Sequence, residues 1–236
     1  MAERDVIKTG IKGLDEILLG GIPRGNLILV QGAAGTGKTT LGLEFIYRGI
    51  TEFDEPGMII LFEVSPDKLV RDAASFGWDL RELEQQGRLK IVFTTRQVFA
   101  QEIQQADSLL LSEAAELGAR RIFVDGLRWS SFDNGRGEAF HVLAEGLQRE
   151  GLTALLAVDL TEGRQGWLQQ PEEFVADTVL LLGVERMQRA VQRSIEIQKS
   201  RGQEFQMGVH SFRIFDGKGI EVYRRVQAPR GVERDG

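Results

Sequence analysis

The sequence predicts an α/β fold: one mainly parallel sheet flanked by helices, with an antiparallel extension near the C-terminus. Short, almost continuously apolar runs alternate with helical patterns over most of the 236 residues, as expected for parallel strands buried on both faces. After Leu182 the pattern changes to polar/apolar alternation, which is typical of antiparallel strands. No repeat or linker divides the chain, so we expect a single domain with short flexible tails at about 1–6 and 228–236.

The elements follow from these patterns in chain order. Apolar runs predict parallel strands at Leu27–Val30, Met58–Phe62, Leu89–Phe93, Arg121–Val124, Thr153–Val158 and Thr178–Leu182. Helical periodicity predicts helices that begin near Lys38 and at Pro66–Phe76, Gln101–Leu117 and Glu138–Arg149. Alternation predicts antiparallel strands at Ala190–Gln198, Val209–Phe215 and Ile220–Tyr223, and Asp216–Gly219 has the composition of a hairpin turn.

A phosphate-binding motif follows the first of these strands. Gly32–Thr39 spells G-x-x-x-x-G-K-T. Its glycines (Gly32, Gly35 and Gly37) let backbone N–H groups surround an anion where a Cβ would clash, and the next helix points its positive end at the same place. Lys38 can reach the β- and γ-phosphates, and the Thr39 hydroxyl can ligate Mg²⁺. The motif therefore predicts a site for a nucleoside triphosphate.

Two predicted strands end in a carboxylate. Asp125 follows Arg121–Val124, and we interpret it as the residue that holds Mg²⁺ through a water, rather than as a turn or cap residue. Glu63 follows Met58–Phe62. It either orients the attacking water or precedes the helix start at Ser65-Pro66 as a solvated capping residue, and spacing leaves both open.

A basic pair follows another predicted strand, in Lys199-Ser200-Arg201-Gly202. Two cations spaced by one residue project to the same side of an extended chain and suit a polyphosphate. A solvated basic loop explains the same residues equally well.

Composition excludes several classes of protein. The chain has no cysteine, which excludes disulfides and thiolate metal sites and fits a reducing cytoplasm. No stretch is long and apolar enough to span a membrane, and the first residues lack a signal-peptide pattern. The net charge of −6 argues against a surface made for duplex DNA.

Together these features resemble the KaiC-type ATPases of the RecA superfamily, and most closely the first of the two tandem ATPase domains of the clock protein KaiC. The resemblance extends from Thr9–Asp15 and Gly20–Gly25 to about Tyr223. Its specific segments are Ser75–Leu80, Glu172–Asp177 and Lys199–Gly202.

The resemblance implies a RecA-like fold, a homohexameric ring and ATP bound with Mg²⁺ between neighbouring subunits. It assigns the phosphates and Mg²⁺ to Thr36, Gly37, Lys38, Thr39 and Thr40, and the metal-side carboxylate to Asp125. It also implies that Lys199, Ser200 and Arg201 reach the ATP of the adjacent subunit, and that Ser75 lies near the nucleotide.

Two departures from the family matter. KaiC has a Glu-Glu pair where this chain has Glu63-Val64; we retain Glu63 as the catalytic residue that orients water, beside Lys38, and expect the turnover rate to be affected. The Ser-Thr pair that KaiC's second domain phosphorylates corresponds to Glu173-Phe174, so we expect no clock-style phosphorylation cycle there.

The sequence favours an ATPase whose hydrolysis switches a ring between conformations that a regulatory protein partner recognises. One alternative is a RecA/RadA-like ATPase that binds single-stranded DNA through Leu127–Glu138 (Arg128, Trp129 and Arg136) and Thr161–Gln170 (Arg164 and Trp167). The other is an ATP sensor with low turnover. Kinase activity stays open, because phosphoryl transfer to a hydroxyl uses nearly the same site.

Overall fold

The computed structural model describes residues 5–105, 107–127, 138–160, 175–187 and 190–224. Its centre is a nine-stranded sheet of order β11-β10-β9-β8-β3-β7-β6-β4-β5. The parallel part consists of β3 (Leu27–Gly32), β4 (Gly57–Leu61), β5 (Leu89–Phe93), β6 (Arg121–Leu127), β7 (Thr153–Asp159) and β8 (Thr178–Met187). The antiparallel flank consists of β9 (Ala190–Ser200), β10 (Val209–Phe215) and β11 (Gly219–Tyr223).

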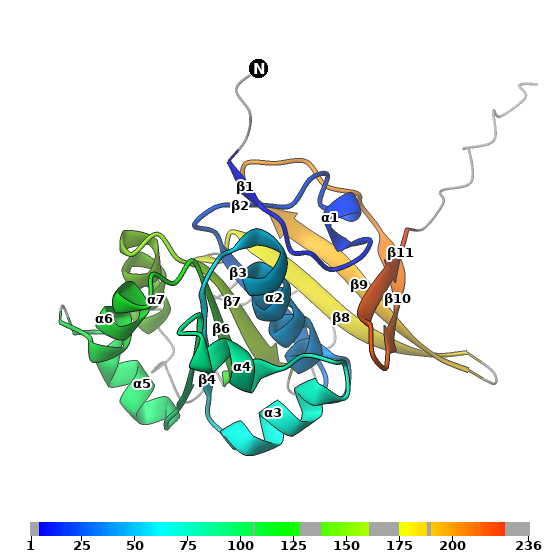
Figure 1. Cartoon of the computed structure of the whole chain (residues 1–236). Coiled ribbons are helices and arrows are strands. Elements are labelled where there is room, and N and C mark those ends of the chain that lie inside the picture. The colour runs from blue at the N-terminus through cyan, green and yellow to red at the C-terminus, as the bar shows by residue number, and fades with distance from the viewer. Residues whose placement is uncertain (1–4, 106, 128–137, 161–174, 188–189, 225–236) are drawn as a thin grey trace, which may run out of the picture.

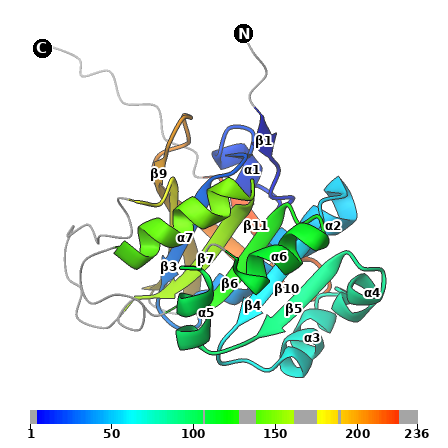
Figure 2. The ribbon, with the colours of Figure 1, turned by 90° about the vertical axis from the view of Figure 1, so that its left-hand side faces the viewer.

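Helices cover both faces of the sheet (Figures 1 and 2). On one face lie α2 (Lys38–Phe53), α3 (Pro66–Ala74) and α4 (Leu80–Gln85), whose apolar residues form one core cluster. On the other face lie α5 (Arg96–Glu102), α6 (Leu109–Glu116) and α7 (Glu138–Arg149), which contribute to a second cluster. The central strands β3, β4, β6 and β7 are buried on both faces, which explains why they read as continuous apolar runs.

The predicted fold class is confirmed: a parallel sheet between helices with antiparallel strands at its C-terminal side. The turn at Asp216–Gly219 also joins β10 and β11 as predicted, with Phe215 opposite Gly219. None of the helices in the described part of the chain combines the length and the apolarity that crossing a bilayer requires.

The single helix predicted at Gln101–Leu117 is wrong. The structure has two helices there, because α5 ends at Glu102 and α6 begins at Leu109. Ser108 caps the second helix by accepting a hydrogen bond from the Leu111 backbone N–H at 3.2 Å, and Glu102 Oε2 accepts one from Leu109 N–H at 2.9 Å. These side-chain acceptors stabilise the start of a second helix. Apolar residues continue with helical spacing across this point, so the sequence pattern alone shows no break.

Val6, at the inner end of the segment expected as a tail, is part of the fold. Val6 belongs to β1 (Val6–Ile7), which pairs with β2 (Ile22–Pro23) on either side of the short helix α1 (Leu14–Ile17). The backbone carbonyl of Lys8 accepts a hydrogen bond of 2.8 Å from the fully buried Arg121 side chain, which ties this segment to the sheet. The predicted tail at 228–236 lies outside the described residues.

The order of the strands positions the candidate site. In the parallel part of a sheet all carboxyl ends meet at one edge, so the residues that follow β3, β4, β6 and β7 gather there.

Candidate functional site

The phosphate loop connects β3 to α2 in a tight turn. Gly37, with φ +105°, stands immediately before α2, and its carbonyl accepts the hydrogen bond of Leu41 N–H at 2.9 Å. A Cβ on Gly32 would lie 2.7 Å from both the Leu182 carbonyl oxygen and Thr36 Oγ1. Glycine is therefore required where the loop leaves the strand, and the left-handed Gly37 turns the chain into the helix.

Lys38 is buried at the base of this loop. Its Nζ donates hydrogen bonds to the carbonyl oxygens of Gly32 at 2.8 Å and Ala33 at 2.9 Å, and lies 2.8 Å from Asp159 Oδ1. Asp159 ends β7, the neighbour of β3, with Gly32 directly opposite it. The sequence analysis missed Asp159, although it carries the signal that identified Asp125: a carboxylate at the end of an apolar strand.

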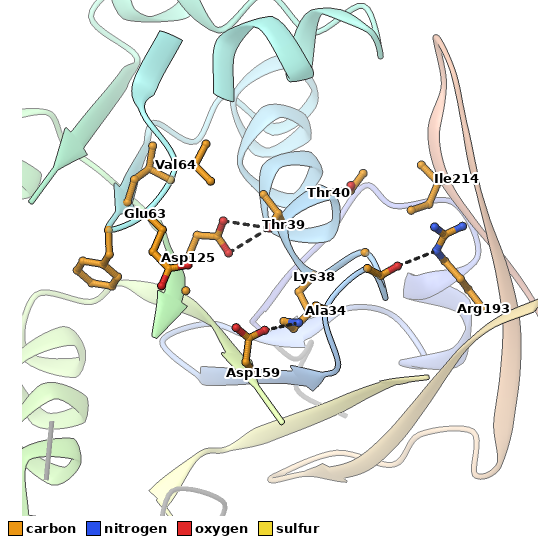
Figure 3. A pocket seen from close by; sticks show the side chains of 15 residues that line it. Ala34, Lys38, Thr39, Thr40, Glu63, Val64, Asp125, Asp159, Arg193 and Ile214 are labelled. Carbon is orange, nitrogen blue, oxygen red and sulfur yellow. Dashed lines mark hydrogen bonds and ion pairs between the residues drawn. The ribbon is translucent and has the colours of Figure 1, made fainter. Parts of the chain in front are cut away.

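Thr39 and Asp125 are brought together as expected. Thr39 Oγ1 donates to the Asp125 carboxylate, with 3.0 Å to Oδ2 and 3.2 Å to Oδ1 (Figure 3). Asp125 lies within β6 rather than after it, where the register with β7 shifts between Val124 and Leu127. Burial raises the pKa of Asp125, while the Thr39 hydroxyl and the Lys38 charge oppose that rise. A cation beside this buried carboxylate would favour its charged form.

Glu63 follows β4 at the same sheet edge and is half exposed. Its Oε1 lies 2.6 Å from the Nη2 of Arg96, a residue that the sequence analysis did not select. The same guanidinium donates to the carbonyl oxygen of Gly126, from Nε at 2.8 Å and from Nη2 at 2.7 Å. Arg96 therefore connects the turn after β4 to the residue that follows Asp125.

Lys38, the Thr39–Asp125 pair, Glu63 and Asp159 line one pocket of about 440 Å³, a size that suits a nucleotide-sized ligand (Figure 3). Arg193 and Ile214 of the antiparallel flank stand across the phosphate loop from Glu63, and Arg193 Nε donates to the Gly35 carbonyl at 3.4 Å. The lining residues are Ala34, Gly35, Gly37, Lys38, Thr39, Thr40, Leu61, Phe62, Glu63, Val64, Asp125, Gly126, Asp159, Arg193 and Ile214.

Comparison with known proteins identifies the family. A protein-family model described as "ATPase: KaiC" matches residues 7–227. The chain belongs to the KaiC ATPase family. Circadian clock oscillator proteins KaiC from Prochlorococcus marinus and Synechococcus elongatus are 33% and 34% identical over 93% and 92% of this chain. The chain covers 48% and 44% of them, so it spans about half the length of these relatives.

A solved structure extends the comparison to the fold. The crystal structure of a KaiC-like protein from the hyperthermophilic archaeon Pyrococcus horikoshii is similar with a TM-score of 0.81 and 30% sequence identity. The match covers 94% of this chain and 100% of that one. The KaiC-like, RecA-type fold that the sequence resemblance implied is therefore confirmed.

The basic pair implied by the KaiC resemblance lies away from the pocket. Thr178 pairs with Ile28 near the start of β3 and with Ser200 in β9, whereas the phosphate loop leaves β3 at Gly32, opposite Leu182. Lys199 Nζ donates to the Ala176 carbonyl at 2.6 Å, and Arg201 pairs with Asp177 at 3.5 Å. Within one chain, Lys199, Ser200 and Arg201 therefore stand at the opposite sheet edge from the phosphate loop.

Two other expected residues form hydrogen bonds within the fold. Thr36 Oγ1 donates to the Ala33 carbonyl at 2.9 Å, inside the phosphate loop. Ser75 is the residue that caps the C-terminal end of α3; its hydroxyl donates to the Asp72 carbonyl at 2.7 Å, and its own carbonyl accepts from Gly217 N–H at 3.1 Å. Ser75 is not among the residues that line the pocket.

Several features of the sequence analysis lie outside the described residues. They are the two loops considered for single-stranded DNA, with Arg128, Trp129, Arg136, Arg164 and Trp167, and the Glu173-Phe174 pair.

Proposed function

We propose that this KaiC-family protein hydrolyses ATP and works as a nucleotide-driven switch in a homo-oligomeric ring. One observation carries the proposal: Lys38, the Thr39–Asp125 pair and Glu63 converge on one pocket at the carboxyl ends of parallel strands. This position is where open α/β sheets bind their ligands, and these groups are the cation, metal ligands and carboxylate that phosphoryl transfer requires.

In this proposal the phosphate loop holds the ATP phosphates. Gly32, Gly35, Thr36 and Gly37 set the path of the loop, whose backbone N–H groups surround the phosphates. Lys38 contacts the γ-phosphate, and Thr40 lines the pocket beyond. Ser75 is proposed as a more distant nucleotide contact, on the family resemblance alone.

Thr39 and Asp125 are proposed to hold Mg²⁺, Asp125 through a water. The residues fit that ion, because a hydroxyl and a buried carboxylate already lie 3.0 Å apart and both are oxygen ligands. When bound, Mg²⁺ would neutralise charge that develops on the phosphates. Without a cation, the buried Asp125 carboxylate is disfavoured in its charged form.

Glu63 is proposed to orient the water that attacks the γ-phosphorus. It accepts the proton as the new P–O bond forms and the bond to the β–γ bridging oxygen breaks, releasing ADP and phosphate. A single glutamate performs this role, since Val64 occupies the place of the second one in KaiC.

Lys199, Ser200 and Arg201 are proposed to act in trans. Their position at the opposite sheet edge keeps them from the pocket of their own chain, whereas a neighbour in a ring can receive them. A site completed by two subunits couples nucleotide state to their relative arrangement. The hexameric state, the regulatory partner and the cytoplasmic location expected from the cysteine-free sequence stay predictions.

The test combines light scattering after chromatography in Mg-ATP with phosphate release. We expect a hexamer, and an Arg201→Ala variant that binds ATP but turns over at least about tenfold more slowly, or about 1.4 kcal/mol. Arg71→Ala, which removes an exposed arginine that pairs with its neighbour Asp72, serves as a matched control.

Mixing distinguishes action in trans from action in cis. A Lys38→Ala subunit should not bind ATP in its own pocket but should still supply Arg201 to its neighbour. Rings that mix Lys38→Ala and Arg201→Ala subunits should therefore regain part of the ATPase activity. A monomer with full turnover would contradict the ring. Tight ATP binding with negligible turnover would favour the sensor, and salt-sensitive binding of single-stranded DNA would favour the recombinase-like alternative.

A further inference from the structure

We propose that Arg96 is a positioning residue for hydrolysis: it holds the Glu63 carboxylate at a fixed place relative to Asp125. The inference rests on the proposed function, in which Glu63 orients the attacking water. It adds a residue that is marked by no sequence motif and that reaches the site from the opposite face of the sheet to α2.

Arg96 is itself held firmly. It is the first residue of α5, and Thr95 caps that helix by accepting a hydrogen bond from Val98 N–H at 3.2 Å. Its guanidinium is bound to the Gly126 carbonyl through two nitrogens and lies 5.4 Å from the centre of the Phe62 ring. The side chain is only 19% exposed. A planar fork that is packed and doubly hydrogen-bonded loses little further entropy when it binds a carboxylate.

Glu63 lies in a less regular setting. It belongs to the bend between β4 and α3, and its side chain is 48% exposed. A glutamate in such a position samples several rotamers unless a partner selects one. The 2.6 Å contact with Arg96 Nη2 provides this selection, because charge-assisted hydrogen bonds of this length are among the stronger ones.

Gly126 links this contact to the metal-side carboxylate. Its carbonyl, held by Arg96, belongs to the residue directly after Asp125, at the irregular part of β6 where φ of Gly126 is +75°. Arg96 is therefore anchored on the backbone next to Asp125, and from there it holds Glu63 at a set distance from that residue. A water between Glu63 and the γ-phosphate needs that spacing to be kept, since small displacements cost large factors in rate.

A purely structural role makes a different prediction. If Arg96 only attached α5 to the sheet, its loss would lower stability and leave turnover per folded molecule unchanged. If it restrained Glu63 from acting, its loss would raise turnover. If Arg96 positions Glu63, the loss of Arg96 slows turnover and leaves ATP affinity unchanged, and it does so only in proteins that retain Glu63.

The experiment is a double-mutant cycle on the full chain, with phosphate release, ATP affinity and thermal unfolding measured for each protein. The variants are Arg96→Met, Glu63→Ala and their combination. We expect Arg96→Met to lower kcat at least about tenfold with less than about twofold change in ATP affinity, and to have no further effect in Glu63→Ala. Arg96→Lys, which keeps the charge and stem but not the fork, should fall between wild type and Arg96→Met.

The results distinguish a failure of this inference from a failure of the proposed function. Full turnover by Glu63→Ala contradicts the proposed function of Glu63 itself, and the inference with it. Slow Glu63→Ala together with normal or faster Arg96→Met overturns the inference alone. Equal losses from Arg96→Met with and without Glu63 also overturn it, because Arg96 would then act through another group. If Arg96→Met does not fold, Arg96→Lys in both backgrounds gives the same comparison.

Discussion

Lys38 and Asp159 face each other at the base of the pocket, with Lys38 Nζ 2.8 Å from Asp159 Oδ1. The pair follows from the strand order, since β7 lies beside β3 and puts Asp159 opposite Gly32. The lysine is buried, while the aspartate side chain is 44% exposed. A phosphate that binds Lys38 must therefore share the ammonium group with the Asp159 carboxylate or displace that carboxylate.

Asp159→Asn should tighten ATP binding, because it removes a negative charge beside a site for a polyanion. Half-exposed ion pairs contribute about 0.2–1 kcal/mol, so we expect a gain of about 1.4- to 5-fold in affinity. Titration with a fluorescent ATP analogue at fixed Mg²⁺ measures it. Asp72→Asn, which replaces an exposed acidic residue outside the pocket, should leave the ATP affinity unchanged. Weaker binding by Asp159→Asn would instead indicate that Asp159 helps to hold the ligand.

Much of this site could be predicted from the sequence because its parts are local. The strand–loop–helix around Lys38 is contiguous, and Asp125 ends an apolar run, so each residue carries its own signal. The Arg96–Glu63 contact carries none, since it joins residues 33 positions apart and depends on how α5 packs. The break between α5 and α6 was missed for a related reason: Ser108 and Glu102 terminate an apolar period by hydrogen bonds that periodicity does not report.

Glu44 should make stability depend on pH. It is buried in α2, where Ile220 N–H donates to it at 2.6 Å and Arg48 Nε lies 3.4 Å away. Burial raises the pKa of Glu44 to about 7, against 4.5 for an ordinary glutamate. Because the folded state favours the protonated carboxyl, this contribution to stability is complete below about pH 4.5 and is lost as the pH rises through about 7.

We therefore expect the free energy of unfolding of the wild type to fall by about 2–3 kcal/mol, relative to Glu44→Gln, between pH 4.5 and 8. Urea unfolding of both proteins over this range measures the difference. Asp125, whose pKa is also raised, contributes equally to both proteins and cancels. Parallel curves for the two proteins would show that Glu44 does not titrate in this way.

Arg121 should be required for stability rather than for ATP turnover. Its side chain is fully buried and donates to Glu55 Oε2 at 2.7 Å and to the carbonyl oxygens of Phe45 at 2.9 Å and Lys8 at 2.8 Å. Arg121→Ala removes these donors together, empties a fully buried site and takes a donor from the buried Phe45 carbonyl, while Glu55 keeps its ion pair with Arg24, so we expect a loss of about 3–5 kcal/mol. Urea unfolding measures it, and the exposed Arg71→Ala should stay within about 0.5 kcal/mol of wild type.

Two helical glycines allow a matched test of packing. A Cβ on Gly42 of α2 would lie 2.1 Å from the Phe123 ring of β6, so α2 must move away or the ring must turn. A Cβ on Gly146 of α7 would lie 3.5 Å from Leu111 Cδ1, which is an ordinary contact. Gly42→Ala should therefore cost about 1–3 kcal/mol, whereas Gly146→Ala should add about 0.4–1 kcal/mol by restricting the unfolded chain.

Thermal and urea unfolding of the two variants measure these changes in stability, which we expect to have opposite signs. The consequence also reaches the site, because α2 begins at Lys38 and cannot shift without moving the phosphate loop. Gly42→Ala should thus weaken ATP binding while Gly146→Ala leaves it unchanged. A stable Gly42→Ala with normal affinity would mean that the Phe123 ring gives way and that the close approach of α2 to β6 is not what fixes the loop.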